Sequence, residues 1–253
     1  MVSPRAIVLA GDGVNCENET VHALRLGGFE AESHHVSRLL STGDFLTNSD
    51  LLVLPGGFSF GDEIASGKVL AVKMRHKMLD ILHSYIDRGN LVLGICNGFQ
   101  ILVQLGLLPN SDYGAEPTVS LTHNIGGKFI NRWVEMKVNS KSVFFAGLDK
   151  ITLPIRHGEG RLRLKAGASS KEIETVRKYA AMNYLENVNG SFEKIAGLLN
   201  AEGNVLGLMP HPEAFIHLHQ HPAYQYYRRR PDSPLPATAD GLSILRNAFE
   251  ALN

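Results

Sequence analysis

The chain has little cysteine and no excess of charge of either sign. Only Cys16 and Cys96 occur among its 253 residues, which excludes the framework of several disulfides that holds small secreted domains together. Lysine plus arginine and aspartate plus glutamate number 25 each, so the net charge is zero with neutral histidines. This balance gives no reason to expect nucleic acid or an acidic membrane surface as the main partner.

Long apolar runs are also missing. No stretch approaches the roughly 20 apolar residues that a membrane-spanning helix needs. The first apolar run, residues 6–10, is too short for the core of a signal peptide and is followed at once by Gly11-Asp12-Gly13. We therefore expect a cytoplasmic protein without membrane association, whose thiols stay reduced and available for chemistry.

What the first half does contain is an alternation of short apolar runs and longer amphipathic segments. Strands are predicted over residues 6–10, 31–36, 50–57 and 91–95, and helices over 18–26, 70–88 and 99–105. Strands that are apolar throughout and alternate with helices indicate a parallel sheet covered on both faces. The expected fold is α/β: an open, doubly wound, mostly parallel sheet flanked by helices.

The second half carries strand-like runs over 118–138, 153–164 and 195–208, which we expect to extend the same sheet, partly antiparallel. No linker or internal repeat divides the chain, so residues 1–253 are predicted to form a single domain with a surface insert near 216–238. This insert holds three alternating histidines, an aromatic run and three arginines before a last helix over 241–252. Metal binding by the histidines and a basic-aromatic nucleic-acid patch are the weaker interpretations, because no ligand spacing is recognisable and the chain is neutral.

A candidate nucleophile lies where the strand over 91–95 meets the next helix. The segment reads Gly94-Ile95-Cys96-Asn97-Gly98, the cysteine form of the nucleophile elbow. Such a turn needs small residues two positions either side, and it sets the thiol at a helix N-terminus, where the helix dipole favours thiolate. The Asn97 N–H, directly after the nucleophile, is placed to donate to an oxyanion. The structural alternative is a buried cysteine beside packing glycines.

A candidate base follows the strand that ends at Met209. In Pro210-His211-Pro212-Glu213 the prolines favour extended backbone, in which residues two apart point the same way. The Glu213 carboxylate can then hold one nitrogen of His211 and leave the other for Cys96, the nucleophile–base–orienter arrangement of a triad. The structural alternative is a surface turn.

Gly-Ile-Cys-Asn-Gly-Phe-Gln at 94–100 and Pro-His-Pro-Glu at 210–213 resemble the class I, triad-type glutamine amidotransferases, whose fold is flavodoxin-like. Segments at 55–62, 128–134, 154–161 and 189–197 narrow the resemblance to the glutaminase subunits of phosphoribosylformylglycinamidine synthase, from purine biosynthesis. It covers most of residues 5–215 and resumes at 240–252.

The resemblance implies an enzyme that hydrolyses glutamine through a cysteine thioester. The ammonia would pass to an ATP-dependent synthetase subunit that makes formylglycinamidine ribonucleotide, and a third, small subunit is a further expected partner. No cofactor is expected on this chain. It has no Gly-x-x-x-x-Gly-Lys-[Ser/Thr] phosphate loop, so ATP and magnesium are expected on the synthetase.

The resemblance also implies site residues beyond the triad. Gly57 and Phe58 would line the glutamine site, with a backbone N–H completing the oxyanion hole beside Asn97, and Gln100 would help to hold glutamine. Residues 157–161 would lie near the active site or the synthetase contact. No metal ligands are predicted. Cys16 is interpreted as a structural residue, because nothing in the sequence pairs it with a base.

Two segments depart from the family pattern: the insert from about 216 to 238, and residues 64–67. Two functional alternatives stay open at this point. One is an amidotransferase subunit with a different acceptor, and the other is a non-catalytic, glutaminase-like regulatory subunit.

Overall fold

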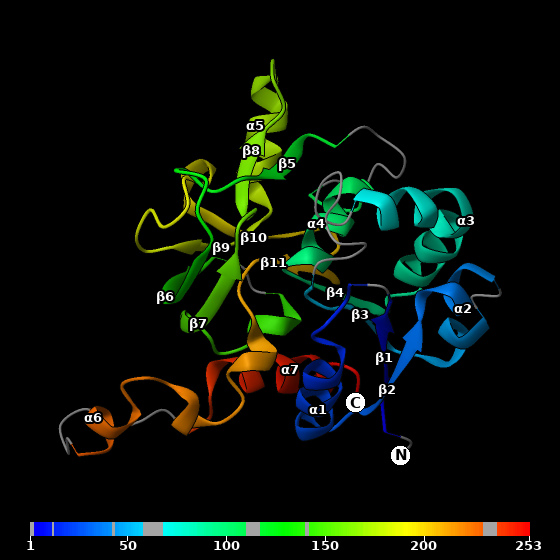
Figure 1. The fold of residues 1–253 in the computed structure, drawn as a ribbon. Coiled ribbons are helices and arrows are strands. Elements are labelled where there is room, and N and C mark those ends of the chain that lie inside the picture. Colours follow the sequence, from blue (N-terminus) through cyan, green and yellow to red (C-terminus); the bar gives the residue numbers. More distant parts are fainter. Residues whose placement is uncertain are drawn as a thin grey trace.

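The computed structural model describes residues 3–11, 13–41, 44–57, 68–109, 117–139, 142–229 and 237–253. Its main element is a nine-stranded sheet in the order β2-β1-β3-β4-β11-β10-β9-β6-β7 (Figure 1). A separate two-stranded sheet pairs β5 with β8. None of the helices in these ranges is long and apolar enough to cross a membrane.

One half of the large sheet is parallel. Its strands are β1 (Arg5–Ala10), β2 (Glu30–His35), β3 (Leu51–Leu54), β4 (Leu91–Ile95) and β11 (Val205–Leu208). The order β2-β1-β3-β4-β11 is that of flavodoxin-like, doubly wound sheets. Strands β3, β4 and β11 are buried at every residue, as expected where both faces are covered. The predicted α/β fold is confirmed.

The other half is antiparallel. It consists of β10 (Ile195–Leu199), β9 (Ala180–Tyr184), β6 (Ile130–Val138) and β7 (Lys150–His157). The prediction that every strand-like run extends this sheet is wrong for β5 (Val119–Thr122) and β8 (Arg161–Leu164), which pair only with each other. Strand β7 runs beside β6 up to His157, and the chain then bends through Gly158 and Gly160, so β8 leaves the edge of the large sheet.

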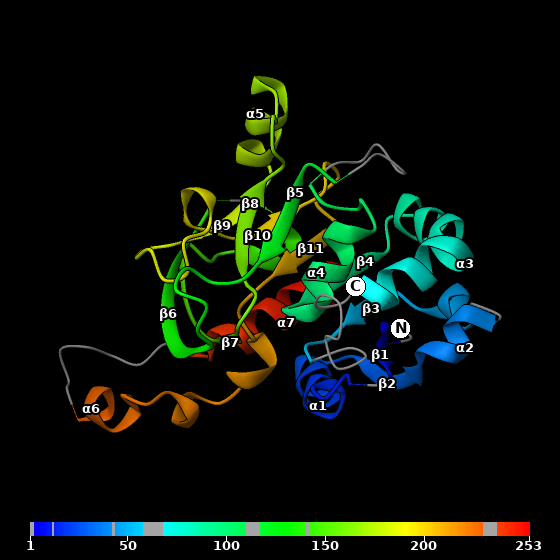
Figure 2. The ribbon, with the colours of Figure 1, turned by 45° about the horizontal axis from the view of Figure 1, so that its top comes forward.

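Helices cover both faces of the parallel half. On one side α1 (Glu17–Gly27) packs against α7 (Asp240–Glu250), and on the other α3 (Lys68–Asp87) packs against α4 (Asn97–Gln104) (Figures 1 and 2). The predicted apolar face of α3 is buried, except that Ile81 is 38% exposed. Shorter helices in the described ranges include α2 (Val36–Ser41), η1 (Asp44–Asn48), η3 (Val143–Phe145), α5 (Ser170–Lys178) and η4 (Phe192–Lys194).

The predicted surface insert projects from the body of the protein and carries two short helices, η6 (Leu218–Gln220) and α6 (Tyr224–Arg228) (Figures 1 and 2). Its base is held by aromatic contacts. The Trp133 ring lies edge-on to Phe215, with centroids 4.9 Å apart, and to His221, with centroids 4.8 Å apart. The insert therefore docks on strand β6.

The carboxyl ends of the parallel strands meet at one edge of the sheet, where open α/β folds bind ligands. The segments that follow β1, β3, β4 and β11 carry Cys16, Gly57, Cys96 and His211 respectively. The topology thus gathers residues that are far apart in the sequence at one place.

Candidate active site

Cys96 occupies a strained turn between β4 and α4. Its φ is +51° and its ψ is −103°, a conformation that costs a non-glycine residue about 1 to 3 kcal/mol and persists only where the surroundings enforce it. The Cys96 N–H donates to the Leu208 carbonyl at 2.8 Å, which ties the turn to β11. Cys96 is 8% exposed, and its Sγ lies 3.9 Å from the Arg156 carbonyl oxygen.

The two glycines of the elbow are required by packing. A Cβ at Gly98 would lie 1.9 Å from the Leu54 carbonyl oxygen, and a Cβ at Gly94 would lie 2.8 Å from the Gly98 carbonyl carbon. Neither clash can be relieved by turning a side chain, because the facing atoms belong to the backbone. The predicted elbow is therefore present, with the glycine requirement that its motif implies.

His211 and Glu213 form a buried pair beside the thiol. The Nδ1 atom of His211 lies 2.6 Å from Oε1 of Glu213, and the two residues are 4% and 5% exposed. The His211 N–H donates to the Pro154 carbonyl at 2.9 Å, which fixes its backbone against β7. The structure thus brings the predicted base and orienter together.

The predicted reason for this pairing is only half right. His211 is extended, with φ −109° and ψ 91°, but residues Pro212–Ala214 form a 3-10 turn, η5. Pro212, with its fixed φ, opens that turn and His211 is its N-cap, so Glu213 reaches back to the imidazole from the first turn of a helix rather than along a strand.

The charge of His211 depends on its neighbours. Burial opposes a charge on this ring, but the Glu213 carboxylate and interactions with the Cys16 and Cys96 thiols outweigh burial and raise the pKa of His211 well above its usual range. The imidazole is therefore protonated near neutral pH. A cationic ring beside a thiol favours the thiolate, the nucleophilic form of cysteine.

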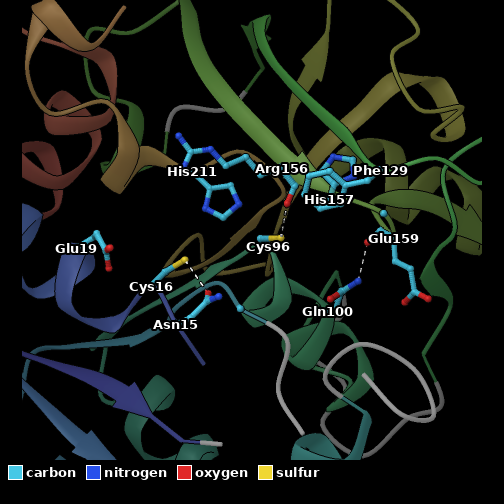
Figure 3. A pocket seen from close by; sticks show the side chains of 12 residues that line it. Asn15, Cys16, Glu19, Cys96, Gln100, Phe129, Arg156, His157, Glu159 and His211 are labelled. Atoms are coloured by element: carbon cyan, nitrogen blue, oxygen red, sulfur yellow. Dashed lines mark hydrogen bonds between the residues drawn. The ribbon is translucent and has the colours of Figure 1, made fainter. Parts of the chain in front are cut away.

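A cavity of about 310 Å³ opens over the thiol (Figure 3), which is within the usual range for a small-molecule site. Its lining combines the two thiols and His211 with charged residues. The lining residues are Asn15, Cys16, Glu19, Gly57, Cys96, Gln100, Phe129, Arg156, His157, Gly158, Glu159 and His211. The cations and carboxylates of this lining suit a zwitterionic ligand.

The predicted substrate-binding residues take different positions. Gly57 lines the cavity at φ +144°, and a Cβ there would lie 2.7 Å from the Gly13 carbonyl oxygen, so only glycine fits. Gln100 also lines the cavity and donates from Nε2 to the Glu159 carbonyl at 2.6 Å. Asn97 is 1% exposed at the start of α4. Phe58 and residues 64–67 lie outside the described residues.

His157, which the resemblance placed near the site, lines the cavity as a neutral ring. Asn124 donates from Nδ2 to the carbonyls of His157 and Lys128, at 2.7 and 2.9 Å. Its Oδ1 therefore faces His157 Nδ1 and accepts its proton at 3.0 Å. Burial, with a smaller effect of His211, lowers the pKa of His157 to about 4. Arg161 instead points away from the cavity and donates to the Gly190 carbonyl.

Cys16, which the sequence pairs with no base and which is interpreted as structural, lies beside His211 in the structure. It lines the cavity, and a Cβ at Gly56 would lie 2.9 Å from His211 Cε1 and 3.4 Å from Cys16 Sγ, which places thiol and imidazole side by side. Figure 3 shows Cys16 and Cys96 pointing into the same cavity beside the His211 ring. The sequence does contain a signal for this placement. Cys16 follows β1, and the carboxyl ends of β1 and β4 lie at the same edge of the sheet.

The alternating histidines of the insert do not form a metal-binding group. The rings of His217 and His219 stack with centroids 5.2 Å apart, while His221 packs on Trp133. In the part of the chain that the structure describes, the one group of three residues with converging metal-ligand atoms is Cys16, His211 and Glu213.

The comparisons with known proteins agree with this geometry. Residues 3–250 match the family model of the CobB/CobQ-like glutamine amidotransferase domain. The chain is 36% identical, over 272 residues, to "Phosphoribosylformylglycinamidine synthase subunit PurQ" of Methanococcus maripaludis strain C7, which covers 100% of this chain and 98% of the relative. It is 39% identical, over 219 residues, to the Thermotoga maritima protein of the same name, with 85% of this chain and 90% of the relative covered.

Solved structures agree as well. The structure of PurLQS from Thermotoga maritima contains a chain with a TM-score of 0.76 and 33% identity, with both chains covered completely. A glutamine amidotransferase from Thermotoga maritima, at 16% identity and a TM-score of 0.56, shares the fold over 100% of this chain and 99% of its own. The chain belongs to the CobB/CobQ-like glutamine amidotransferase family and, within it, to the PurQ subunits of phosphoribosylformylglycinamidine synthase.

Proposed function

We propose that this chain is the glutaminase subunit of phosphoribosylformylglycinamidine synthase: it hydrolyses glutamine at Cys96 and supplies the ammonia to a synthetase partner in purine biosynthesis. The observation that carries the proposal is the thiol–imidazole–carboxylate arrangement in which Cys96 and His211 line the cavity and Glu213 pairs with His211. A strained elbow costs stability, and a purely structural role does not explain it.

The proposed reaction is acyl transfer through a thioester. The Cys96 thiolate attacks the side-chain carbonyl carbon of glutamine, and the carbonyl π electrons move to oxygen. When the C–N bond breaks, the His211 imidazolium donates its proton to the leaving amine, which departs as ammonia. The neutral imidazole then takes a proton from water, whose oxygen attacks the thioester and releases glutamate and the Cys96 thiolate.

Backbone donors around the thiol would stabilise the oxyanion of each tetrahedral intermediate. The Asn97 N–H at the start of α4 is one proposed donor, and a backbone N–H of the Gly57–Phe58 segment is the other. The position of Gly57 supports this assignment, because Gly57 lies at the cavity wall with a φ of +144°. Gln100 is the proposed contact for the body of the glutamine substrate.

The partners follow from the relatives. The Thermotoga maritima structure is named for a PurLQS complex, which supports two partners for this chain: a synthetase subunit, together with a third, small one. ATP and magnesium are proposed to bind on the synthetase and not here. The cytoplasmic location and the single-domain organisation over residues 1–253 remain predictions.

The decisive experiment uses the assembled complex, because the synthetase partner consumes the ammonia. Cys96→Ala is expected to abolish glutamine-dependent synthesis of formylglycinamidine ribonucleotide and to leave ammonia-dependent synthesis intact. Retained glutaminase activity in Cys96→Ala would refute the nucleophile. Loss of both glutamine-dependent and ammonia-dependent synthesis in Cys96→Ala would refute a role limited to ammonia supply. If the wild-type chain supports no synthesis of formylglycinamidine ribonucleotide, a different synthetase is favoured.

A further inference from the structure

Cys16 adds a third type of ligand atom to the His211–Glu213 pair. Its Sγ, a ring nitrogen of His211 and a carboxylate oxygen of Glu213 all lie within 4.8 Å of one another. We propose that these three side chains form a Zn²⁺ site whose occupation reversibly inhibits the enzyme. The inhibition rests on the proposed function, whereas the binding site does not.

Two buried atoms in this cluster lack partners. Among the described residues, Oε2 of Glu213 and Nε2 of His211 are fully covered and have no hydrogen-bond partner, although both residues are at least 95% buried. An unpaired buried carboxylate oxygen is costly. Catalysis accounts for the free Nε2, which faces the thiol chemistry, but it gives no role to Glu213 Oε2. A cation bound at the cluster would satisfy that oxygen.

The donor set selects the kind of metal. Thiolate sulfur, imidazole nitrogen and one carboxylate oxygen are typical ligands of Zn²⁺, whereas Mg²⁺ and Ca²⁺ take oxygen ligands. Metal–ligand bonds of about 2.0 to 2.3 Å set tetrahedral ligand atoms roughly 3.3 to 3.8 Å apart, so side-chain shifts of about 1 Å complete the site. The Cys16 thiolate and the Glu213 carboxylate together balance the charge of the ion.

The cation also has a path to this cluster. Cys16 is partly exposed and lines the cavity, while His211 forms part of the same wall. The Cys16 thiol makes a long contact to Asn15 Oδ1, at 3.4 Å, which costs little to break when the sulfur turns to a metal. The fourth ligand position then faces the cavity, where water or the Cys96 sulfur completes the coordination.

Occupation of the site stops the reaction by removing the base. The metal replaces the proton on the ring nitrogen that it binds and occupies part of the Glu213 carboxylate, so His211 is no longer an imidazolium. The metal-bound ring is a much weaker acid toward the leaving ammonia and cannot take a proton from water. Glutamine and Zn²⁺ also compete for one cavity. Inhibition is therefore expected to be reversed by a chelator and weakened by saturating glutamine.

The first test reads the metal site without any activity. The full-length Cys96→Ala variant keeps Cys16 as its only thiol. Titration with Co²⁺, a spectroscopic substitute for Zn²⁺, is expected to produce a thiolate-to-cobalt charge-transfer absorption that saturates at one ion per chain and disappears when Zn²⁺ is added. The Cys16→Ala/Cys96→Ala double variant is the matched control and should lack the band. Glu213→Gln in the Cys96→Ala chain should weaken Co²⁺ binding by about tenfold or more.

A Cys96→Ala chain that binds no Co²⁺, or binds it without the sulfur band, overturns the proposal, provided that its thermal unfolding matches the wild type. The second test measures inhibition of the assembled complex by Zn²⁺, with Mg²⁺ as the negative control. The activity of each protein is normalised to its own rate without metal. The Zn²⁺ concentration that halves this activity should be at least about tenfold higher for Cys16→Ala than for the wild type, and an unchanged concentration contradicts the inference. If the wild type lacks glutaminase activity, the proposed function fails while the Co²⁺ titration still decides the site.

Discussion

Only Pro212 separates His211 from Glu213, yet Nδ1 of the imidazole lies 2.6 Å from Oε1 of the carboxylate and both side chains are buried. The contact sets the tautomer and the charge of the ring together, because a carboxylate accepts the Nδ1 proton and stabilises the imidazolium. The charge state of His211 thus depends on one neighbouring side chain that is itself shielded from solvent.

Glu213→Gln keeps the shape of this side chain and removes its charge. We expect the pKa of His211 to fall, since the carboxylate is the largest of the effects that offset burial. Glutamine-dependent turnover should drop roughly 10⁴-fold, the scale seen when the carboxylate of a catalytic triad becomes an amide. Steady-state kinetics of the complex measure this, and unchanged ammonia-dependent synthesis shows that the complex is intact.

The same variant tests how stability depends on pH. Because the folded-state pKa of His211 is raised, its contribution to stability is complete below the ordinary value of 6.5 and is lost as pH rises through the raised pKa. The gap in unfolding free energy between wild type and Glu213→Gln should therefore shrink from about pH 6.5 upward. Urea denaturation at several pH values measures the gap, and a gap that widens with pH contradicts the assignment.

His157→Asn should make the protein less sensitive to acid. The pKa of His157 is lowered from 6.5 to about 4, mainly by burial, so between these values the unfolded chain binds a proton that the folded chain excludes. This removes roughly 3 kcal/mol of stability by pH 4. Asparagine retains an N–H for Asn124 and does not titrate. Urea denaturation should give a shallower loss between about pH 6.5 and pH 4 than in wild type; parallel curves would rule out His157 as the cause.

Gly98→Ala should unfold the protein or make it insoluble, with a loss above about 4 kcal/mol. The added methyl group would lie 1.9 Å from the Leu54 carbonyl oxygen, in the backbone of β3. Gly27→Ala is the control: its Cβ would lie 3.4 Å from Leu245, and alanine favours helix α1 by up to about 1 kcal/mol. Thermal unfolding compares the two, and a well-folded Gly98→Ala chain would show that the elbow tolerates a side chain.

Trp133→Ala should loosen the insert from strand β6. Two edge-on ring contacts, to Phe215 and His221, would be lost, each worth about 0.5 to 1.5 kcal/mol beyond its buried area. Trypsin should then cut faster after Arg228 or Arg229, at the end of α6. Tyr226→Ala serves as the control, because that ring is 54% exposed. Equal cleavage rates in the two variants would mean that Trp133 does not hold the insert.

The elbow at Cys96 and the pairing of His211 with Glu213 were predictable because each is set by a few adjacent residues. The elbow is a local steric requirement for Gly94 and Gly98, and Pro212 holds Glu213 close to His211 whatever the turn. Helix α5 had a local signal that was not used: Ser169 and Glu172 form a capping box. Strand β9, which follows that helix at Ala180–Tyr184, was missed with it.

The position of Cys16 beside His211 and the separate β5–β8 sheet could not be predicted from neighbouring residues in the sequence. Cys16 meets His211 only because β1 and β11 end at the same edge of the sheet, a contact between distant parts of the chain. Strand β8 has the apolar pattern of a sheet strand, but its partner is decided by the bend through Gly158 and Gly160. Pattern alone specifies that a strand forms, and long-range packing specifies where it pairs.

The parallel pairing of β4 with β11 also has a consequence for biosynthesis of the protein itself. The ribosome delivers the thiol long before the imidazole, and β11 joins the sheet only after the whole antiparallel half has been made. Since N-terminal segments emerge and begin to fold first, an unfinished chain holds a cysteine with no proton carrier. Under the proposed mechanism, the growing polypeptide is therefore expected to lack glutaminase activity until β11 has joined the sheet.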